Sequence, residues 1–224
     1  MADQPTEASY TPDPAYQYNS TGGPNTMVRN GTGSYTATIP GLTKKGGNVQ
    51  VTAYGKNPAR CKVSDWSASD SGTSANVLCF DGTGVAADEK FTLAYTIGVP
   101  MGLWNYKHDK GNTHYGDSGA YAWADQPDNT KTYRPPHAFN YNGFDTGRLT
   151  VAWQQTGNYL VTLRGVEDLG AAGILVTANG DGNTTCSAGN TNEGYNPVEV
   201  NCFDQNANPV DSEFSVLFQT DLKK

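Results

Sequence analysis

Residues 47–54 read Gly-Asn-Val-Gln-Val-Thr-Ala-Tyr, in which polar and apolar side chains alternate from Asn48 onward. Successive side chains of a strand point to opposite faces, so this alternation predicts a strand with one buried face. The same pattern recurs at 34–39 and 91–95, each bounded by Gly, Pro, Asn or Asp. No window of a dozen residues carries helical spacing of apolar residues without an interrupting Gly, Pro or Asn. We therefore expect an all-β protein of antiparallel strands.

The dipeptide Asn30-Gly31 predicts a turn. It lies between the short stretch 27–29 and the strand-like residues 34–39. Asn and Gly both tolerate the positive φ that tight hairpin turns need. We expect a hairpin whose turn is centred on this pair.

The chain repeats itself. Ala2-Asp3-Gln4-Pro5 recurs as Ala124-Asp125-Gln126-Pro127, and later segments recur in the same order at an offset of 122 to 125 residues. The matched pairs include Tyr10-Thr11-Pro12 with Tyr133-Arg134-Pro135, Tyr16–Asn19 with Phe139–Asn142, Thr32–Tyr35 with Thr156–Tyr159, Val51–Ala53 with Val176–Ala178, Cys79–Asp81 with Cys202–Asp204, and Phe91–Leu93 with Phe214–Val216. Because the mismatches fall mainly in turns, we interpret the chain as a tandem duplication of one β-unit.

The duplication sets the expected domains. Each unit has about 95 residues and six to eight short strands at a spacing of roughly 8–12 residues, as in antiparallel sandwiches or small barrels. We expect two tandem antiparallel β-sandwich domains, Ig-like or jelly-roll-like. The first repeat is assigned to residues 1–96, a connector to 97–120 and the second repeat to 121–224.

Four cysteines fall two per copy at matching places, Cys61 and Cys79 in the first and Cys186 and Cys202 in the second. Four cysteines allow three pairings, but a unit that once stood alone favours pairing within each copy. Four buried free thiols are the alternative, and zinc is disfavoured because there is no Cys-x-x-Cys spacing and no His near either pair. Since disulfides form in oxidising compartments, we expect a secreted protein.

The start of the chain differs from the start of the second copy. Met1 is followed at once by Ala2, whereas the second Ala-Asp-Gln-Pro motif is preceded by Tyr121-Ala122-Trp123. We interpret Met1 as standing in place of a removed signal sequence or an upstream segment.

Three motifs of the repeat are distinctive. Its start reads Ala-Trp-Ala-Asp-Gln-Pro at 122–127, one strand reads Gly-Asn-Val-Gln-Val-Thr-Ala-Tyr-Gly at 47–55, and its ending reads Cys-Phe-Asp…Phe-Thr-Leu-x-Tyr at 79–95. In these motifs the chain resembles secreted tandem-repeat proteins of actinobacterial-type soil bacteria, over most of its length. The resemblance implies export and repetition. It brings no activity and no catalytic residues with it.

Composition excludes two classes of protein. Lys and Arg number 15 against 22 Asp and Glu in 224 residues, which gives a formal net charge of −7. A nucleic-acid binder needs a basic face to displace counterions from phosphates, so we expect no nucleic-acid partner. No apolar run approaches the roughly 18 residues of a membrane span, so we expect no transmembrane segment.

Motifs in the connector and second copy offer catalytic or metal chemistry only weakly. Gly116-Asp117-Ser118-Gly119 has the form of a trypsin-like nucleophile motif, but Ala120 follows it and no Ala-Ala-His-Cys segment supplies a base, so we interpret it as a turn. The remaining candidate metal ligands are His108, Asp109 and His114, the series Asn179, Asp181 and Asn183, and the series Asp204, Asn206 and Asn208. We interpret them as solvated loops and polar turns, and expect no metal or cofactor.

Paired acids recur in both copies. Asp88 and Asp211 precede the last strand of each unit, and Asp81 and Asp204 follow its second cysteine. Two carboxylates brought together by a fold would suit glycoside hydrolysis. The alternative is a turn-forming Asp that accepts backbone N–H groups, and recurrence in both copies favours it.

Aromatic residues outside the repeated core suggest binding. Trp104 and Tyr106 lie in the connector, and Trp66 lies in a segment that the second copy does not reproduce. Flat rings beside amide groups suit sugar recognition. We therefore expect a secreted, non-enzymatic module that binds a glycan or cell-surface polymer through Trp66, Trp104 and Tyr106. The first alternative is a structural or interaction protein, such as a coat, a filament subunit or a protein inhibitor, with possible self-association through edge strands. The second alternative is a hydrolase.

Overall fold

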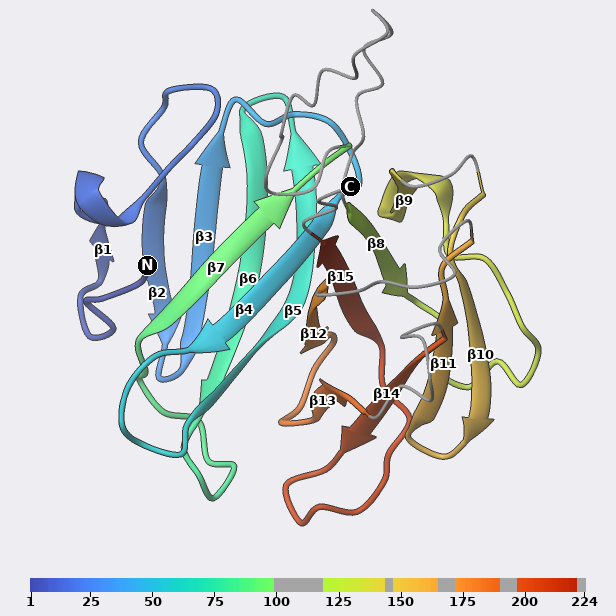
Figure 1. The fold of residues 1–224 in the computed structure, drawn as a ribbon. Helices are drawn as coiled ribbons and strands as arrows, with labels where there is room; N and C mark the ends of the chain where they lie inside the picture. Colours follow the sequence, from blue (N-terminus) through green and yellow to red (C-terminus); the bar gives the residue numbers. More distant parts are fainter. Residues whose placement is uncertain (99–118, 144–146, 165–171, 190–196, 221–224) are drawn as a thin grey trace, which may run out of the picture.

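A computed structural model describes residues 1–98, 119–143, 147–164, 172–189 and 197–220. Their strands form four antiparallel sheets (Figure 1). The first has the order β1 (Ser9–Tyr10), β2 (Thr26–Gly31), β3 (Ser34–Pro40), β6 (Gly72–Phe80) and β5 (Arg60–Ser69), and the second pairs β4 (Asn48–Ala53) with β7 (Phe91–Thr96). The third has the order β10 (Thr150–Gln155), β11 (Asn158–Thr162), β14 (Val198–Phe203) and β13 (Thr185–Ala188), and the fourth β12 (Ala172–Ala178), β15 (Phe214–Thr220), β8 (Gly119–Ala124) and β9 (Asn140–Asn142). Short 3₁₀ helices η1 (Pro14–Tyr16) and η2 (His137–Phe139) complete the elements.

The expected all-β class is confirmed, and the three strands predicted from alternation are present as β3, β4 and β7. The predicted hairpin also forms, since β2 pairs with β3. Its turn, however, lies at residues 32–33 and not at Asn30-Gly31. Gly33 is the residue with positive φ, at 66°, while Gly31 still pairs with Ser34 at a β-bulge. The bulge adds one residue to β2 and so moves the turn along the chain.

The first core lies between the five-stranded sheet and the β4–β7 pair. β4 and β7 cross in front of β3, β6 and β5 (Figure 1). The buried side chains of this core are Ala2, Met27, Tyr35, Ala37, Val49, Val51, Val63, Ala75, Val77, Cys79 and Phe91. Their spacing of two residues along each strand is the period predicted from the sequence.

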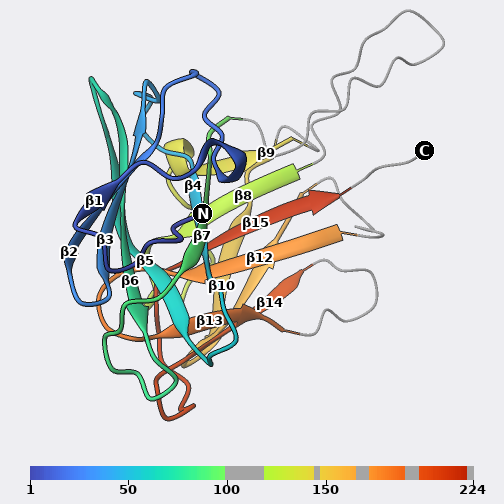
Figure 2. The same ribbon diagram turned by 90° about the vertical axis from the view of Figure 1, so that its left-hand side faces the viewer.

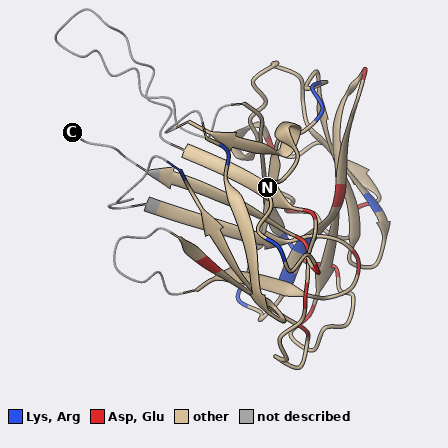
Figure 3. Cartoon of the chain, turned by 90° about the vertical axis from the view of Figure 1, so that its right-hand side faces the viewer, with Lys and Arg blue, Asp and Glu red and all other residues tan. Residues whose placement is uncertain are grey.

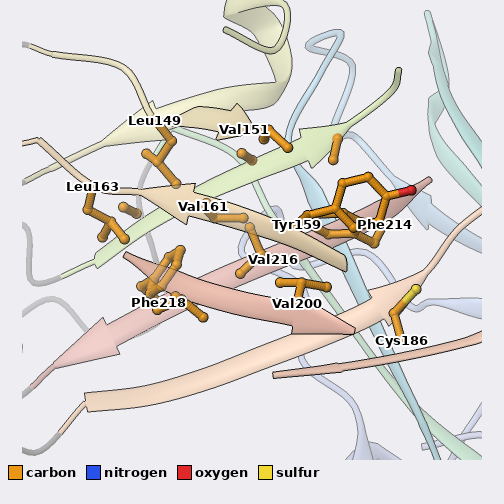
Figure 4. Packing of buried hydrophobic residues seen from close by; sticks show 14 of the residues in the cluster. Leu149, Val151, Tyr159, Val161, Leu163, Cys186, Val200, Phe214, Val216 and Phe218 are labelled. Atoms are coloured by element: carbon orange, nitrogen blue, oxygen red, sulfur yellow. The ribbon is translucent and has the colours of Figure 1, made fainter. Parts of the chain in front are cut away.

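The second core lies between the two four-stranded sheets. Its largest buried side chains are Tyr159, Phe214, Phe218, Leu149 and Leu163 (Figure 4). β8 contributes only small side chains to this core, namely Ala120, Ala122 and Ala124. The packing in both halves is sandwich-like, with opposed sheets that interdigitate their inward residues.

β4 joins the two halves because it is buried on both faces. Val49 and Val51 belong to the first core, while the buried Asn48 and Gln50 carry the opposite face. Figure 2 shows the five-stranded sheet edge-on, with β8, β15 and β12 extending away from it. The polar face of β4 lies against these strands.

The contacts across this boundary are hydrogen bonds between buried groups. Asn48 Nδ2 donates to the carbonyl oxygens of Ala122 at 3.4 Å and Val216 at 3.3 Å. The Thr177 hydroxyl donates to Gln50 Oε1 at 2.8 Å. Since a buried polar group without a partner is costly, these bonds fix how the two halves meet.

Both expected disulfides are confirmed. Cys61 faces Cys79 across β5 and β6, and Cys186 faces Cys202 across β13 and β14. Each bridge ties two neighbouring strands of one sheet. No described cysteine is free.

Candidate functional site

The recurring acids are engaged in turns. Asp88 Oδ1 accepts hydrogen bonds from the Gly33 N–H at 2.9 Å and the Tyr35 hydroxyl at 3.0 Å, and its carboxylate pairs with the Arg29 guanidinium at 2.8 Å. The hydrogen bonds from Arg29 lead the causes that lower the Asp88 pKa to about 2. Asp88 therefore stays ionised and holds the β2–β3 turn against the segment before β7.

Asp211 has the same role in the second half. Its Oδ1 accepts from the Gly157 N–H at 2.8 Å, the Tyr159 hydroxyl at 3.0 Å and the Trp153 indole at 3.1 Å. Asp81 and Asp204 each accept from the backbone N–H groups two and four residues further on. Asp81 and Asp204 thus form their own turns, whereas Asp88 and Asp211 hold a turn from a distant part of the chain. All four accept backbone N–H groups, as in the structural alternative to a hydrolytic pair.

Trp66 lies in an aromatic cluster between the halves. Its ring is 5.2 Å from Trp123 and 5.6 Å from Phe139, and both contacts are edge-on. The Trp66 indole N–H donates to the Gly46 carbonyl oxygen at 3.0 Å. This half-buried indole therefore has a packing role, and its predicted role in glycan binding stays a prediction.

Other predicted candidates lie outside the described residues. These are Trp104 and Tyr106 of the glycan prediction, His108, Asp109 and His114, and Gly116–Ser118 of the nucleophile-like motif. Gly119 and Ala120, which were assigned to the connector, begin β8.

Both calcium-like series take part in hydrogen bonds with protein groups, and in the second of them Asp204 Oδ1 accepts from the Asn206 and Asn208 N–H groups. Asn179 Oδ1 accepts from the Ser215 hydroxyl at 2.8 Å, and Asn183 Nδ2 donates to the Gly84 carbonyl oxygen at 3.1 Å. Within the described ranges, no cluster of three or more His, Cys, Asp or Glu is placed to hold a metal. The Asn179 series therefore serves the boundary between the halves.

A cleft of about 240 Å³ opens between β4 and β5 on one side and β12 and β13 on the other. Its basic wall is made by Arg60 and Lys62. Lys62 is almost wholly buried, and its Nζ donates to the Asp181 carbonyl oxygen at 3.0 Å. Burial lowers the Lys62 pKa to about 8, opposed by the charges of Asp181 and Glu213. The described residues that line this cleft include no aromatic side chain on which a sugar ring could stack.

Charged positions are interspersed along the described ribbon (Figure 3). None of the helices among the described residues has the length and apolar character needed to cross a bilayer.

Among the described residues, β7 has a strand partner along one of its two edges only, and we call the other its open edge. β4 is the only described strand that pairs with β7. On the other side of β7, Ala2 exchanges two backbone hydrogen bonds with Phe91, at 2.7 and 3.2 Å, and no described strand continues this ladder along Leu93–Tyr95. Leu93 and Tyr95 pack against the first core but remain partly exposed.

The open edge was not identified from the sequence. The signal for it was the unmatched Tyr121-Ala122-Trp123, which precedes the second Ala-Asp-Gln-Pro motif and lies in β8. An exposed sheet edge offers unpaired N–H and C=O groups to another chain. No protein-family model, no curated protein and no solved structure matches the chain.

Proposed function

We propose that this protein is a secreted, non-enzymatic interaction protein, built from two tandem copies of one β-sandwich unit, that binds other polypeptide chains through an open sheet edge. The observation that carries the proposal is the edge of β7 at Leu93–Tyr95, which has no strand partner among the described residues. Export is supported by the two disulfides, which form in oxidising compartments.

The tandem architecture is supported by matched contacts. Gly33 and Gly157 both have positive φ, and each donates its N–H to the acid before the last strand of its half. The tyrosine hydroxyls of Tyr35 and Tyr159 bond to the same two acids. The recurring acids serve these turns, which favours an interaction protein over a hydrolase.

Two measurements on the intact chain test the function. The first is sedimentation from micromolar to millimolar concentration, and the second is panning of a displayed library of short peptides against the immobilised protein. We expect either multimers or peptides enriched over an unrelated immobilised β-protein. A chain that stays monomeric at every concentration and enriches no peptide would overturn the proposal.

Glycan or surface-polymer binding is the second candidate. The observation in its favour is that Tyr16 and Tyr18 are exposed by 59% and 86%, so their rings are free to stack on a sugar. A glycan array and a polysaccharide pull-down test it, with Trp104→Ala, Tyr106→Ala and Tyr18→Ala as variants. Retention that the variants reduce supports glycan binding, and no retention of the intact protein removes it.

A further inference from the structure

The open edge of β7 has a closed counterpart in the second half. β15 pairs with both β12 and β8. The two ladders start alike, since Ala2 faces Phe91 as Ala124 faces Phe214. The ladder of β8 and β15 then continues for five further residue pairs, whereas that of β7 ends with the Ala2 bridge within the described chain.

The residues that would flank a strand beside β7 are also in place. In the second half, β9 (Asn140–Asn142) flanks β8, and Asn142 Nδ2 donates to the Arg164 carbonyl oxygen at 2.9 Å. The matching residues 17–19 are held in the same way, since Asn19 Nδ2 donates to the Pro40 carbonyl oxygen at 3.0 Å. We call the space between β7 and residues 17–19 the strand slot.

The first two residues of the chain show how wide the strand slot is. The Met1 ammonium group donates to the Tyr16 carbonyl oxygen at 2.7 Å, next to residues 17–19. Ala2 bonds to Phe91 on the opposite side. One extended segment therefore reaches both walls, so the strand slot is a single strand wide.

Side chains around the strand slot are more exposed than the side chains at the matching positions of the second half. Tyr141 of β9 is half-buried and stacks on Tyr121 of β8 at 5.6 Å, whereas its counterpart Tyr18 is 86% exposed. Val216 and Phe218 of β15 are fully buried, whereas their counterparts Leu93 and Tyr95 are only partly buried. The first core thus remains open along the strand slot.

The side chains of β8 indicate which kind of strand would fit the strand slot. Its side chains Ala120, Ala122 and Ala124 face the core and are buried, so the strand beside this kind of core carries a small residue at every second position. Phe91 directs both its N–H and its C=O to the outer edge of β7. Because backbone direction alternates along a strand, Leu93 and Tyr95 present their groups to the strand slot as well.

We propose that the strand slot is a peptide-binding site. It accepts an extended segment of another polypeptide chain, with small side chains at alternate positions, in antiparallel pairing with Leu93 and Tyr95. Main-chain hydrogen bonds supply the affinity, and the shallow space over the core selects the small residues. The proposal rests on the proposed function and deepens it by naming the edge and the class of segment.

The first experiment uses the peptide Gly-Ala-Tyr-Ala-Trp-Ala, which has the sequence of β8, and the full chain. Amide hydrogen exchange is followed by NMR with and without peptide. We expect the amides of Leu93 and Tyr95 to exchange at least about tenfold more slowly when peptide is bound, because each gains a hydrogen bond. The amides of Thr92 and Ala94 face β4 and should change little. The control peptide Gly-Asp-Tyr-Asp-Trp-Ala places carboxylates toward the core and should give no protection.

The second experiment fills the strand slot from within the chain. Gly-Ala-Tyr-Ala-Trp is inserted between Met1 and Ala2, and Gly-Asp-Tyr-Asp-Trp is inserted in a matched control. The first insertion should raise the melting temperature and abolish protection by added peptide. The control should leave both unchanged. The proposal is overturned if the Gly-Ala-Tyr-Ala-Trp insertion changes neither the melting temperature nor the protection by added peptide. It is also overturned if the peptide protects other amides but not those of Leu93 and Tyr95.

The outcomes separate this proposal from the proposed function. If the chain forms multimers or enriches library peptides while Leu93 and Tyr95 gain no protection, the strand slot is wrong and the interaction function stands. If the β8 peptide protects the amides of Leu93 and Tyr95 while the chain neither forms multimers nor enriches library peptides, the strand slot is supported and the proposed interaction function is overturned. Binding of the peptide and the aspartate control with equal affinity shows a non-specific surface and overturns the strand slot.

Discussion

A single carboxylate, that of Asp88, holds three groups together. It accepts from the Gly33 N–H and the Tyr35 hydroxyl, and it pairs with Arg29. The pKa of Asp88 falls from 3.8 to about 2 because these donors favour the charged form, the Arg29 hydrogen bonds most of all. A lowered pKa in the folded state means stability that is complete above about pH 4 and lost as the pH falls toward 2.

The first prediction concerns this acid. Asp88→Asn should lower the free energy of unfolding at pH 7 by about 1–2 kcal/mol, because the charged acceptor is lost while the donors remain. The variant should also lose less stability than the parent between pH 4 and pH 2. Urea unfolding across this range measures both effects. Asp70→Asn, at an exposed turn, is the matched control and should behave as the parent does.

A second prediction concerns the glycine that forms the turn. Gly33 has a φ of 66°, and a Cβ there would collide with the Cys79 carbonyl oxygen and lie 2.8 Å from the Ala87 nitrogen. Gly33→Ala should therefore cost about 2–4 kcal/mol of unfolding free energy. Gly31→Ala is the control in the same hairpin, because a Cβ there meets nothing within 4 Å. Equal losses in the two variants would contradict this account of the turn.

At the scale of elements, β4 decides how the halves join. The Thr177 hydroxyl of β12 donates to Gln50 Oε1 and accepts from the Val51 N–H at 3.1 Å, and all these groups are buried. Thr177→Val keeps the shape but leaves both partners unsatisfied, so we expect a loss of about 1–3 kcal/mol in calorimetry. Thr52→Val removes a hydroxyl from an exposed position on β4 and should be nearly neutral. If Thr177→Val leaves the stability unchanged, water replaces the hydrogen bonds of the Thr177 hydroxyl.

The elements were the part of the structure that the sequence predicted best. Alternation of polar and apolar residues predicted β3, β4 and β7 because each strand directs its apolar residues to a core, and the matching places of the four cysteines in the sequence predicted both disulfides. The turn after β2 was misplaced because Asn30-Gly31 has turn propensity, while the contact that demands glycine comes from Cys79, far along the chain. Local propensity does not contain that contact.

The candidate site was less predictable, for the same reason. Trp66 was expected to face a glycan because the second copy lacks it. Its neighbours Trp123 and Phe139, however, come from the other half of the chain. The open edge of β7 was missed because an absent partner strand leaves no residue pattern in the strand that lacks it.

At the scale of the whole molecule, the aromatic cluster and the polar contacts of β4 join two cores into one body. We expect a single calorimetric transition for the parent, because each half is stabilised by the other. Trp66→Ala removes the ring that meets Trp123 and Phe139, and should cost about 2–4 kcal/mol and separate the transition into two. Trp153→Ala, which changes a tryptophan within the second half, should lower stability without separating the halves. A single transition in the Trp66 variant would mean that the remaining contacts between the halves, those of β4 among them, are enough to couple them.

The polar face of β4 also bears on how the chain is synthesised. Residues 1–96 leave the ribosome before β8, β12 and β15 exist, so Asn48 and Gln50 face solvent during that interval. An apolar pair at these positions would expose an aggregation-prone sheet face on the nascent chain, whereas the two amides keep this face hydrated. The two amides that make buried hydrogen bonds in the finished protein are therefore also expected to keep its half-made form hydrated and less prone to aggregate.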